Sequence, residues 1–202
     1  DADGLGAFSY QWYRDGVAIG GATGSTYTLG DADVGTQMSV AVSYTDLNGT
    51  AETVTSALTA AVANINDAPT GNVTIDNMTP AEGDTLTAAN TLADADGLSG
   101  AISYQWYRDG VAIGGATGTS YVTVQADVGA VITVVASYTD DQGTAESVTS
   151  AGTAAVTNVN NAPTGSVTIS GTPTEDQVLT ASNTLADADG LGAISYQWYR
   201  DG

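Results

Sequence analysis

The chain has 202 residues, of which 23 are Asp or Glu and three are basic, all of them Arg, so its formal net charge is −20 at pH 7. This charge disfavours partners such as nucleic acid and anionic membrane surfaces. The absence of His, Cys and Lys excludes Ser-His-Asp triads, thiolate and Schiff-base chemistry, structural zinc sites and disulfides.

The sequence is a tandem array of similar segments. The octapeptide SYQWYRDG occurs at 9–16, 103–110 and 195–202, and the linker AVANINDAPTGNVTI returns as AVTNVNNAPTGSVTI. A period of about 93 residues is the size of a whole small domain, larger than one solenoid turn. We therefore expect a partial repeat at 1 to 63, a complete repeat at 68 to 160 and a second partial repeat at 164 to 202.

The first partial repeat carries strand and hairpin signals. Large apolar residues alternate with small polar ones at 8–12 and at 38–44, which is the period-two pattern of half-buried strands. Asp15-Gly16 predicts a tight hairpin turn, and Asn48-Gly49 predicts another. These signals correspond to strands C to G of a seven-stranded fold, without strands A and B.

The complete repeat carries signals for all seven strands. Strand A begins near 71–75, strand B spans 85–90 and strand C spans 101–108, and turn signals follow about every 8 to 12 residues. This pattern predicts an all-β fold in which each repeat is an antiparallel two-sheet sandwich. The residues expected to face its core are Ile102, Tyr104, Trp106, Ile132, Val134 and Tyr138, while Ser103 and Gln105 are expected to face out.

The last partial repeat, 164 to 202, stops after strand C. Half a sandwich cannot close a core. We therefore expect both partial repeats to be completed by strands of a neighbouring copy or of a continuing filament.

The succession YQWYRDG, GATGxTY, DVG and SYTD resembles strands C to G of the immunoglobulin-like repeats of giant bacterial surface adhesins, including those of RTX and biofilm-associated type. The resemblance covers all 202 residues. It implies that Trp106 anchors the core between two sheets and that Arg108-Asp109-Gly110 turns the next hairpin. The disulfide pair and tyrosine corner of antibody domains are missing, so the likeness is to the bacterial branch alone.

Acidic and amide residues recur where adjacent repeats would meet. Strand connectivity places DADG of one repeat near the linker and near the exit loops of the preceding repeat. Ligands that offer only oxygen, several of them charged and spread over three segments, are what Ca²⁺ requires. The candidate ligands are Asp31, Asp33, Asn64, Asn66, Asp67, Asp94 and Asp96 at the first joint, and Glu82, Asp127, Asn158, Asn160, Asn161, Asp187 and Asp189 at the second.

The arrangement is similar to cadherin junctions, in which a DxNDN-type linker, a DxD loop and acidic residues of the upstream domain share calcium ions. At the second joint Asn161 replaces Asp67, which removes a charge and should lower the affinity for Ca²⁺. A plainer interpretation stays open: DADG is a good turn by itself, and acidic turns keep extracellular proteins soluble.

Three classes of function follow. The first is mechanical: structural extender repeats of a bacterial extracellular adhesin or cell-surface fibre, stacked head to tail and rigidified by Ca²⁺, which project a distal module. The second is a binding module for glycan or for homophilic cell–cell adhesion, for which Tyr13 and Tyr107 are the outward aromatics. The third, an enzyme that uses a carboxylate pair, is disfavoured because the same carboxylates recur at every repeat, where a joint would need them.

Overall fold

The computed structural model describes residues 2–200, and the fold is all-β. Its strands form several antiparallel sheets, and the other regular elements within the described part of the chain are two short 3-10 turns. No helix among residues 2–200 is long and apolar enough to cross a membrane. The chain divides into two compact units, one formed by residues up to Thr70 with 93–100 and 139–146, the other by 71–92, 101–138 and the residues from Ser147 onward.

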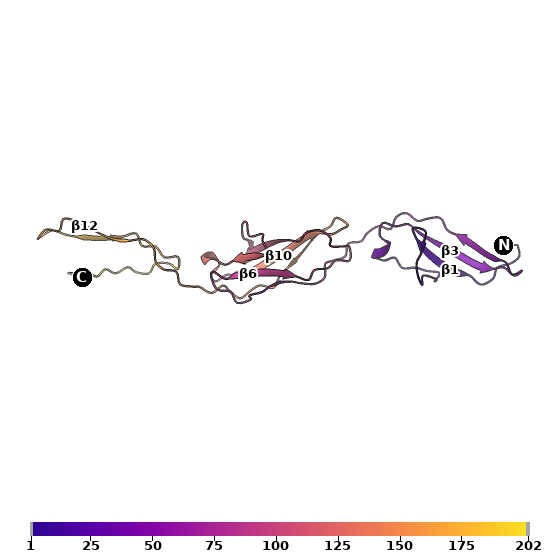
Figure 1. The fold of residues 1–202 in the computed structure, drawn as a ribbon, viewed down its shortest axis with the longest axis horizontal. Helices are drawn as coiled ribbons and strands as arrows, with labels where there is room; N and C mark the ends of the chain where they lie inside the picture. Colours follow the sequence, from indigo (N-terminus) through magenta and orange to yellow (C-terminus); the bar gives the residue numbers. More distant parts are fainter. Residues whose placement is uncertain (1, 201–202) are drawn as a thin grey trace. The chain divides into compact units, whose positions relative to one another are not determined.

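The first partial repeat forms one four-stranded sheet in the order β2-β1-β3-β4 (Figure 1). Asp15 and Gly16 connect β1 to β2 with φ values of +45° and +80°, the backbone of a two-residue hairpin turn. The elements are β1 (Ser9–Arg14), β2 (Val17–Ala18), the 3-10 turn η1 (Asp31–Asp33), β3 (Met38–Thr45) and β4 (Ala51–Thr55).

The complete repeat contains the same sheet, in the order β11-β10-β7-β8, and a second sheet in the order β5-β6-β9. The elements of the four-stranded sheet are β7 (Ser103–Arg108), β8 (Val111–Ala112), β10 (Ile132–Thr139) and β11 (Ala145–Thr149). Those of the three-stranded sheet are β5 (Val73–Ile75), β6 (Thr85–Asn90) and β9 (Ser120–Val122), followed by the 3-10 turn η2 (Gln125–Asp127).

The core of the complete repeat lies between these two sheets and contains Trp106. Its indole is fully buried, lies 5.8 Å from the ring of Tyr121 and donates a hydrogen bond to the carbonyl of Gly118 at 3.0 Å. The three-stranded sheet contributes Val73, Ile75, Leu86 and Ala88, and the four-stranded sheet contributes Trp106, Ile132, Val134 and Ala136. The repeat is therefore a sandwich of two sheets that share one apolar interior.

The expected inward and outward faces of the complete repeat are confirmed with one difference. Trp106, Ile132, Val134 and Tyr138 are buried, and Ile102 and Tyr104 pack against the core. Ser103 is exposed as expected, but Gln105 is half-buried. Its amide donates to the carbonyls of Trp106 and Ile113, both at 2.8 Å, and so ties the start of the next hairpin to β7.

The last partial repeat forms a two-stranded antiparallel sheet of β12 (Val167–Ser170) and β13 (Thr180–Asn183) (Figure 1). Strand C, expected at the end of this repeat, is absent from residues 192–200. In the complete repeat this strand pairs with β10, and the last partial repeat has no counterpart of β10. A strand without a hydrogen-bonded neighbour has no ladder to join.

Tryptophan exposure gives a test of this difference between repeats. Variants that keep only Trp106 or only Trp198, the other tryptophans being replaced by Phe, should differ in acrylamide quenching of fluorescence. Trp106 is 0% exposed and Trp198 is 48% exposed, so Trp106 should emit at shorter wavelength and be quenched several-fold less. Equal quenching of the two variants would contradict the closed core of the complete repeat.

Candidate functional site

The DADG loop of the complete repeat is an aspartate turn that holds the preceding linker. Asp94 Oδ1 accepts the N–H of Asp96 at 2.9 Å, and the Asp94 carbonyl accepts that of Gly97 at 3.2 Å. Gly97 has a φ of +95°, a conformation that favours glycine. The turn buries Asp96, whose Oδ2 accepts the N–H of Asp67 at 2.6 Å. A charge-assisted hydrogen bond therefore anchors the linker to the loop.

Carboxylates of three segments gather around Asp67. The negative charge of Asp31 raises the pKa of Asp67 above its usual range, and burial and the charges of Asp96 and Asp94 raise it further. Asp31 belongs to η1, Asp67 to the linker and the other two to the DADG loop. The expected first joint thus brings these four carboxylates within electrostatic range of one another.

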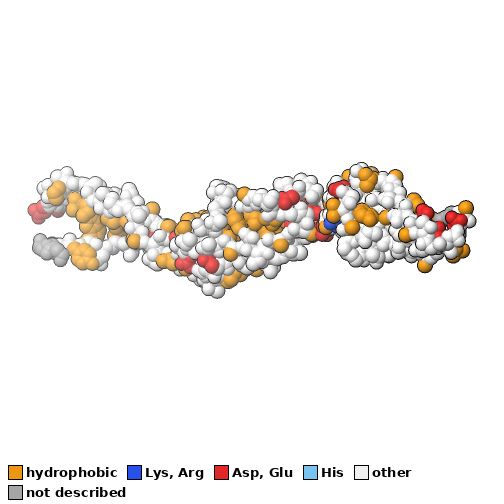
Figure 2. Space-filling view, turned by 45° about the vertical axis from the view of Figure 1, so that its right-hand side comes forward, with side chains coloured by type: hydrophobic (Ala, Val, Ile, Leu, Met, Phe, Trp, Pro, Cys, Tyr) orange, Lys and Arg blue, Asp and Glu red, His pale blue; other side chains and the backbone are white. Residues whose placement is uncertain are grey.

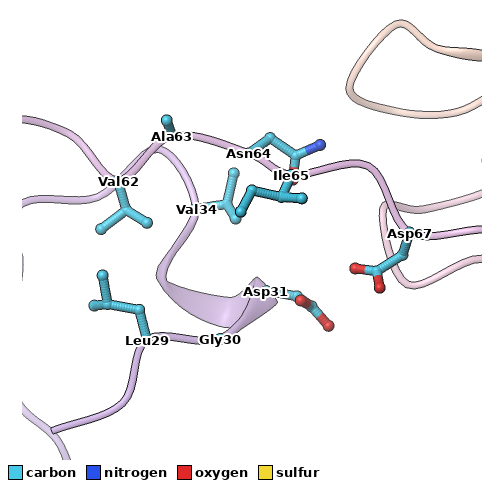
Figure 3. Close-up of a pocket in the computed structure, with 9 residues that line it drawn as sticks. All are labelled: Leu29, Gly30, Asp31, Val34, Val62, Ala63, Asn64, Ile65 and Asp67. Carbon is cyan, nitrogen blue, oxygen red and sulfur yellow. The ribbon is translucent and has the colours of Figure 1, made fainter.

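A hollow of about 250 Å³ lies between η1 and the linker. Figure 3 shows the carboxylates of Asp31 and Asp67 directed toward one another at one side of this hollow. Asn64 lines the same hollow as part of the linker. Apolar side chains of Leu29, Val34, Val62 and Ile65 make up most of the remaining lining.

Three further acidic residues in this unit of the chain were not anticipated from the sequence. Asn66 Nδ2 donates to Glu146 Oε1 at 2.8 Å, and Asp141 Oδ1 accepts the N–H of Ser99 at 3.1 Å. The adjacent Asp140 has a buried Oδ2 that accepts no hydrogen bond from the described residues. The recurrence of GTAE at 49–52 and 143–146 was the signal that could have identified Glu146.

The second joint repeats the geometry of the first. Asp187 Oδ1 accepts the N–H of Asp189 at 2.9 Å, and Asp189 Oδ2 accepts the N–H of Asn161 at 2.6 Å. The side-chain amide of Asn161 also donates to Glu82 Oε1 at 3.2 Å. Both joints are therefore built on a linker N–H held by the second aspartate of the loop.

The two joints differ in charge. The backbone hydrogen bond from Asn161 lowers the pKa of Asp189, against an opposing effect of burial, and side-chain hydrogen bonds from Asn158, Asn161 and Gln125 lower it further. By sequence alignment of the repeats, Gln125 occupies the position of Asp31, and Asn161 that of Asp67. Two carboxylates of the first joint are thus amides at the second. Asn160 donates its amide to the carbonyl of Asn161 at 3.1 Å.

Asp33 and Asp127 each form an ion pair with an arginine inside their own repeat. Asp127 is fully buried, and its Oδ1 accepts Arg108 Nε at 2.5 Å while its Oδ2 accepts the hydroxyl of Tyr121 at 2.7 Å and the N–H of Val124 at 2.8 Å. Arg14 makes the same ion pair with Asp33 in the first repeat, at 2.6 Å. We therefore leave Asp33 and Asp127 out of the proposed metal ligands.

Hydrogen bonds determine the direction in which the pKa of Asp33 is shifted. Burial by itself would raise the pKa of this carboxyl, but hydrogen bonds from the N–H of Gly30, from Arg14 and from Tyr27 together lower it below its usual range. The carboxylate is therefore the form that the folded repeat favours.

The remaining candidates are near one another but do not converge on one point. Among residues 2–200, no group of three or more acidic, His or Cys side chains lies close enough to hold a metal ion as the chain stands. A Ca²⁺ ion with its six to eight ligands would need the first-joint carboxylates to move inward. The donor chemistry fits calcium, since these side chains offer oxygen alone.

No protein-family model matches the chain, and no curated protein matches it.

The buried ion pair should carry much of the stability of the complete repeat. Asp127→Asn keeps the side-chain shape but leaves Arg108 without its counter-ion, so the free energy of unfolding should fall by about 3 kcal/mol, since breaking a buried pair costs roughly 3 to 5 and Arg108 is one-third exposed. Urea denaturation measures the change. Glu175→Gln, at an exposed carboxylate, is the matched control and should change stability by less than about 0.5 kcal/mol. An equal effect of the two variants would count against a structural role for the pair.

The hydroxyl of Tyr121 should ionise at a higher pH than that of an ordinary tyrosine. Burial, then the hydrogen bond to Asp127 and the charge of that carboxylate, raise its pKa to about 12, whereas an unfolded tyrosine ionises near 10. The folded repeat keeps the proton that the unfolded chain loses, so stability should be full below pH 10 and fall as the pH rises toward 12. The tyrosinate absorbance of the wild type minus that of Tyr121→Phe should show one group that ionises near 12. A difference curve centred near 10 would contradict the buried hydrogen bond.

Proposed function

We propose that residues 1–202 are structural extender repeats of a bacterial extracellular adhesin or cell-surface fibre, and that Ca²⁺ stiffens their joints. The observation that carries the proposal is the recurrence of one joint: the linker N–H of Asp67 and that of Asn161 each lie 2.6 Å from the carboxylate of the second aspartate of a DADG loop. A linker held in the same way at successive joints suits a chain that must keep a regular spacing between repeats.

The short linker supports a mechanical role. Val62 at its start pairs with Val34, its N–H donates to the Thr36 carbonyl, and its carbonyl accepts the N–H of Gly35, both at 2.9 Å. Asp67 at its other end is held by Asp96. Only Ala63 to Asn66 lie between these two anchors, too few residues to act as a flexible tether.

Calcium is the proposed stiffening ligand at the first joint. Without an ion, Asp31, Asp67, Asp94 and Asp96 repel one another, which the raised pKa of Asp67 reflects. A divalent ion would turn this repulsion into attraction and hold three segments together. Asn66 and Glu146 provide further oxygen atoms in the same unit.

The alternative is a module that binds glycan or mediates homophilic cell–cell adhesion. The two aromatics expected to form a platform for such a module, Tyr13 and Tyr107, are half-buried in β1 and β7. An enzyme is not proposed, because the chain has no His, Cys or Lys and its carboxylates recur with the joints. A glycan array probed with the whole chain separates the binding role from the extender role.

Calcium should lengthen and stabilise the chain. In small-angle scattering, the maximum dimension should be larger in millimolar Ca²⁺ than in EDTA, and the melting temperature should rise. An ion at a hundred times its dissociation constant adds about 2.7 kcal/mol when it binds only the folded joint. Asp94→Asn combined with Asp96→Asn should remove both effects at the first joint and leave each repeat folded.

A reciprocal exchange supplies the matched control for this experiment. Asp67→Asn gives the first joint the residue of the second and should weaken calcium binding, whereas Asn161→Asp should strengthen it at the second joint. Calorimetric titration of both variants measures the two opposite changes. An unchanged maximum dimension and melting temperature in Ca²⁺ would leave the acidic loops as solvated turns.

A further inference from the structure

We infer that Gln125 closes the second joint without a cation, as an amide that bridges Glu82 of the complete repeat and Asp189 of the last repeat. This residue thereby decides which joints of the array take calcium. The closure itself does not depend on calcium, whereas its contrast with the first joint rests on the proposed function.

The Gln125 side chain lies among polar atoms of both repeats. One of its two amide atoms is 3.0 Å from Glu82 Oε2, 3.2 Å from Asp189 Oδ1 and 3.0 Å from Asn161 Nδ2. These neighbours come from three segments, which are the loop before β6, the DADG loop of the last repeat and the linker. A single group on η2 therefore contacts all three segments of this joint.

The orientation of the Gln125 amide decides whether it can bridge them, because a half-turn exchanges its oxygen and its nitrogen. With the oxygen toward the group, it accepts Asn161 Nδ2 but faces two carboxylate oxygens. With the nitrogen there, it donates to both Glu82 and Asp189. Hydrogen bonds to a charged acceptor are roughly twice as strong as neutral ones, so the two outweigh the one. Asn161 keeps its bond to Glu82 Oε1 at 3.2 Å.

The bridge starts from well-fixed parts of the complete repeat. Gln125 begins η2, and Asp127 at the end of this turn is fully buried. The N–H of Glu82 donates to the carbonyl of Thr157 at 2.9 Å. Gln125 and Glu82 are both half-buried. The loop of the last repeat therefore adds only Asp189, and little side-chain entropy is left to lose on closure.

The electrostatics of the two joints support this difference. Hydrogen bonds, first of all from the Asn161 backbone, lower the pKa of Asp189, whereas the charge of Asp31 raises the pKa of Asp67. Donors thus surround the carboxylate at the second joint, and carboxylates surround one another at the first. On the face drawn in Figure 2, acidic side chains gather in small separate groups. The balance of charge is therefore local to each joint.

The first joint lacks the side chains for such a bridge. Asp31 occupies the position of Gln125, and Asp67 occupies that of Asn161. An ionised carboxylate only accepts hydrogen bonds, so neither residue can donate to the DADG loop. A cation is the remaining way to draw these carboxylates together, in line with the proposed function.

Spin labels on introduced cysteines measure the two joints separately, since the chain has no native Cys. Thr87→Cys with Thr168→Cys spans the second joint, and Thr53→Cys with Thr87→Cys spans the first; all three side chains are exposed. In EDTA, pulsed dipolar spectroscopy should give a narrow distance distribution across the second joint, unchanged by millimolar Ca²⁺. Gln125→Ala should broaden it about twofold or more in EDTA, because the repeats could then pivot about the linker.

Gln125→Glu separates a bridge from a packing role. The added carboxylate should broaden the second-joint distribution in EDTA, and Ca²⁺ should narrow it again, whereas Ca²⁺ should not restore Gln125→Ala. Gln177→Glu adds the same charge at an exposed residue between β12 and β13 and is the matched control, which should leave the distribution unchanged. Urea denaturation of each variant shows that the complete repeat still folds.

Two results would overturn the inference: a second-joint distribution that narrows only in Ca²⁺, or one that stays narrow in EDTA with both Gln125→Ala and Gln125→Glu. A first-joint distribution that ignores Ca²⁺ would count against the proposed calcium role. A narrow second joint in EDTA that broadens with Gln125→Ala would still support the bridge in that case, so the two failures are distinguishable.

Discussion

A sheet with one apolar face is stable only where a second layer covers that face, and this constraint explains the differences between the three repeats. Where both sheets are present, Trp106 is enclosed and β9 forms against β6. Where the second sheet is missing, Trp12 is only half-buried and residues 26–28 stay irregular. Where the first sheet is missing, the hairpin of β12 and β13 exposes Ile169. Nearly identical sequences thus differ in structure because of what lies next to them.

The two joints share one backbone hydrogen bond but differ in charge. In both DADG loops an aspartate accepts a linker N–H at 2.6 Å. Around that bond the first joint places Asp31 and Asp67, and the second places Gln125 and Asn161. Exchange of a carboxylate for an amide of similar shape changes the electrostatic potential with little change in packing. A tandem array built this way can contain joints of graded negative charge on one scaffold.

Sequence patterns could predict the strands and turns because these depend on local alternation and on residues such as Asp15-Gly16. The expected range of β6 matches the structure, and β7 begins two residues later than expected. The roles of individual carboxylates could not be predicted in this way. Asp33 and Asp31 lie in one DAD triplet, yet one faces Arg14 and the other faces the linker, a difference fixed by a strand 19 residues away. The partner of Glu146, Asn66, is 80 residues away, so only the recurrence of GTAE could have pointed to this glutamate.

The arginine–aspartate pairs have a consequence for the outside of the molecule. Arg14 and Arg108 are two of the three cations of the chain, and each is neutralised internally by its own aspartate. The surface is therefore close to a pure polyanion. Chains that lie side by side would repel one another over a distance set by ionic strength, because the screening length shrinks from about 30 Å at 0.01 M salt to about 3 Å at 1 M.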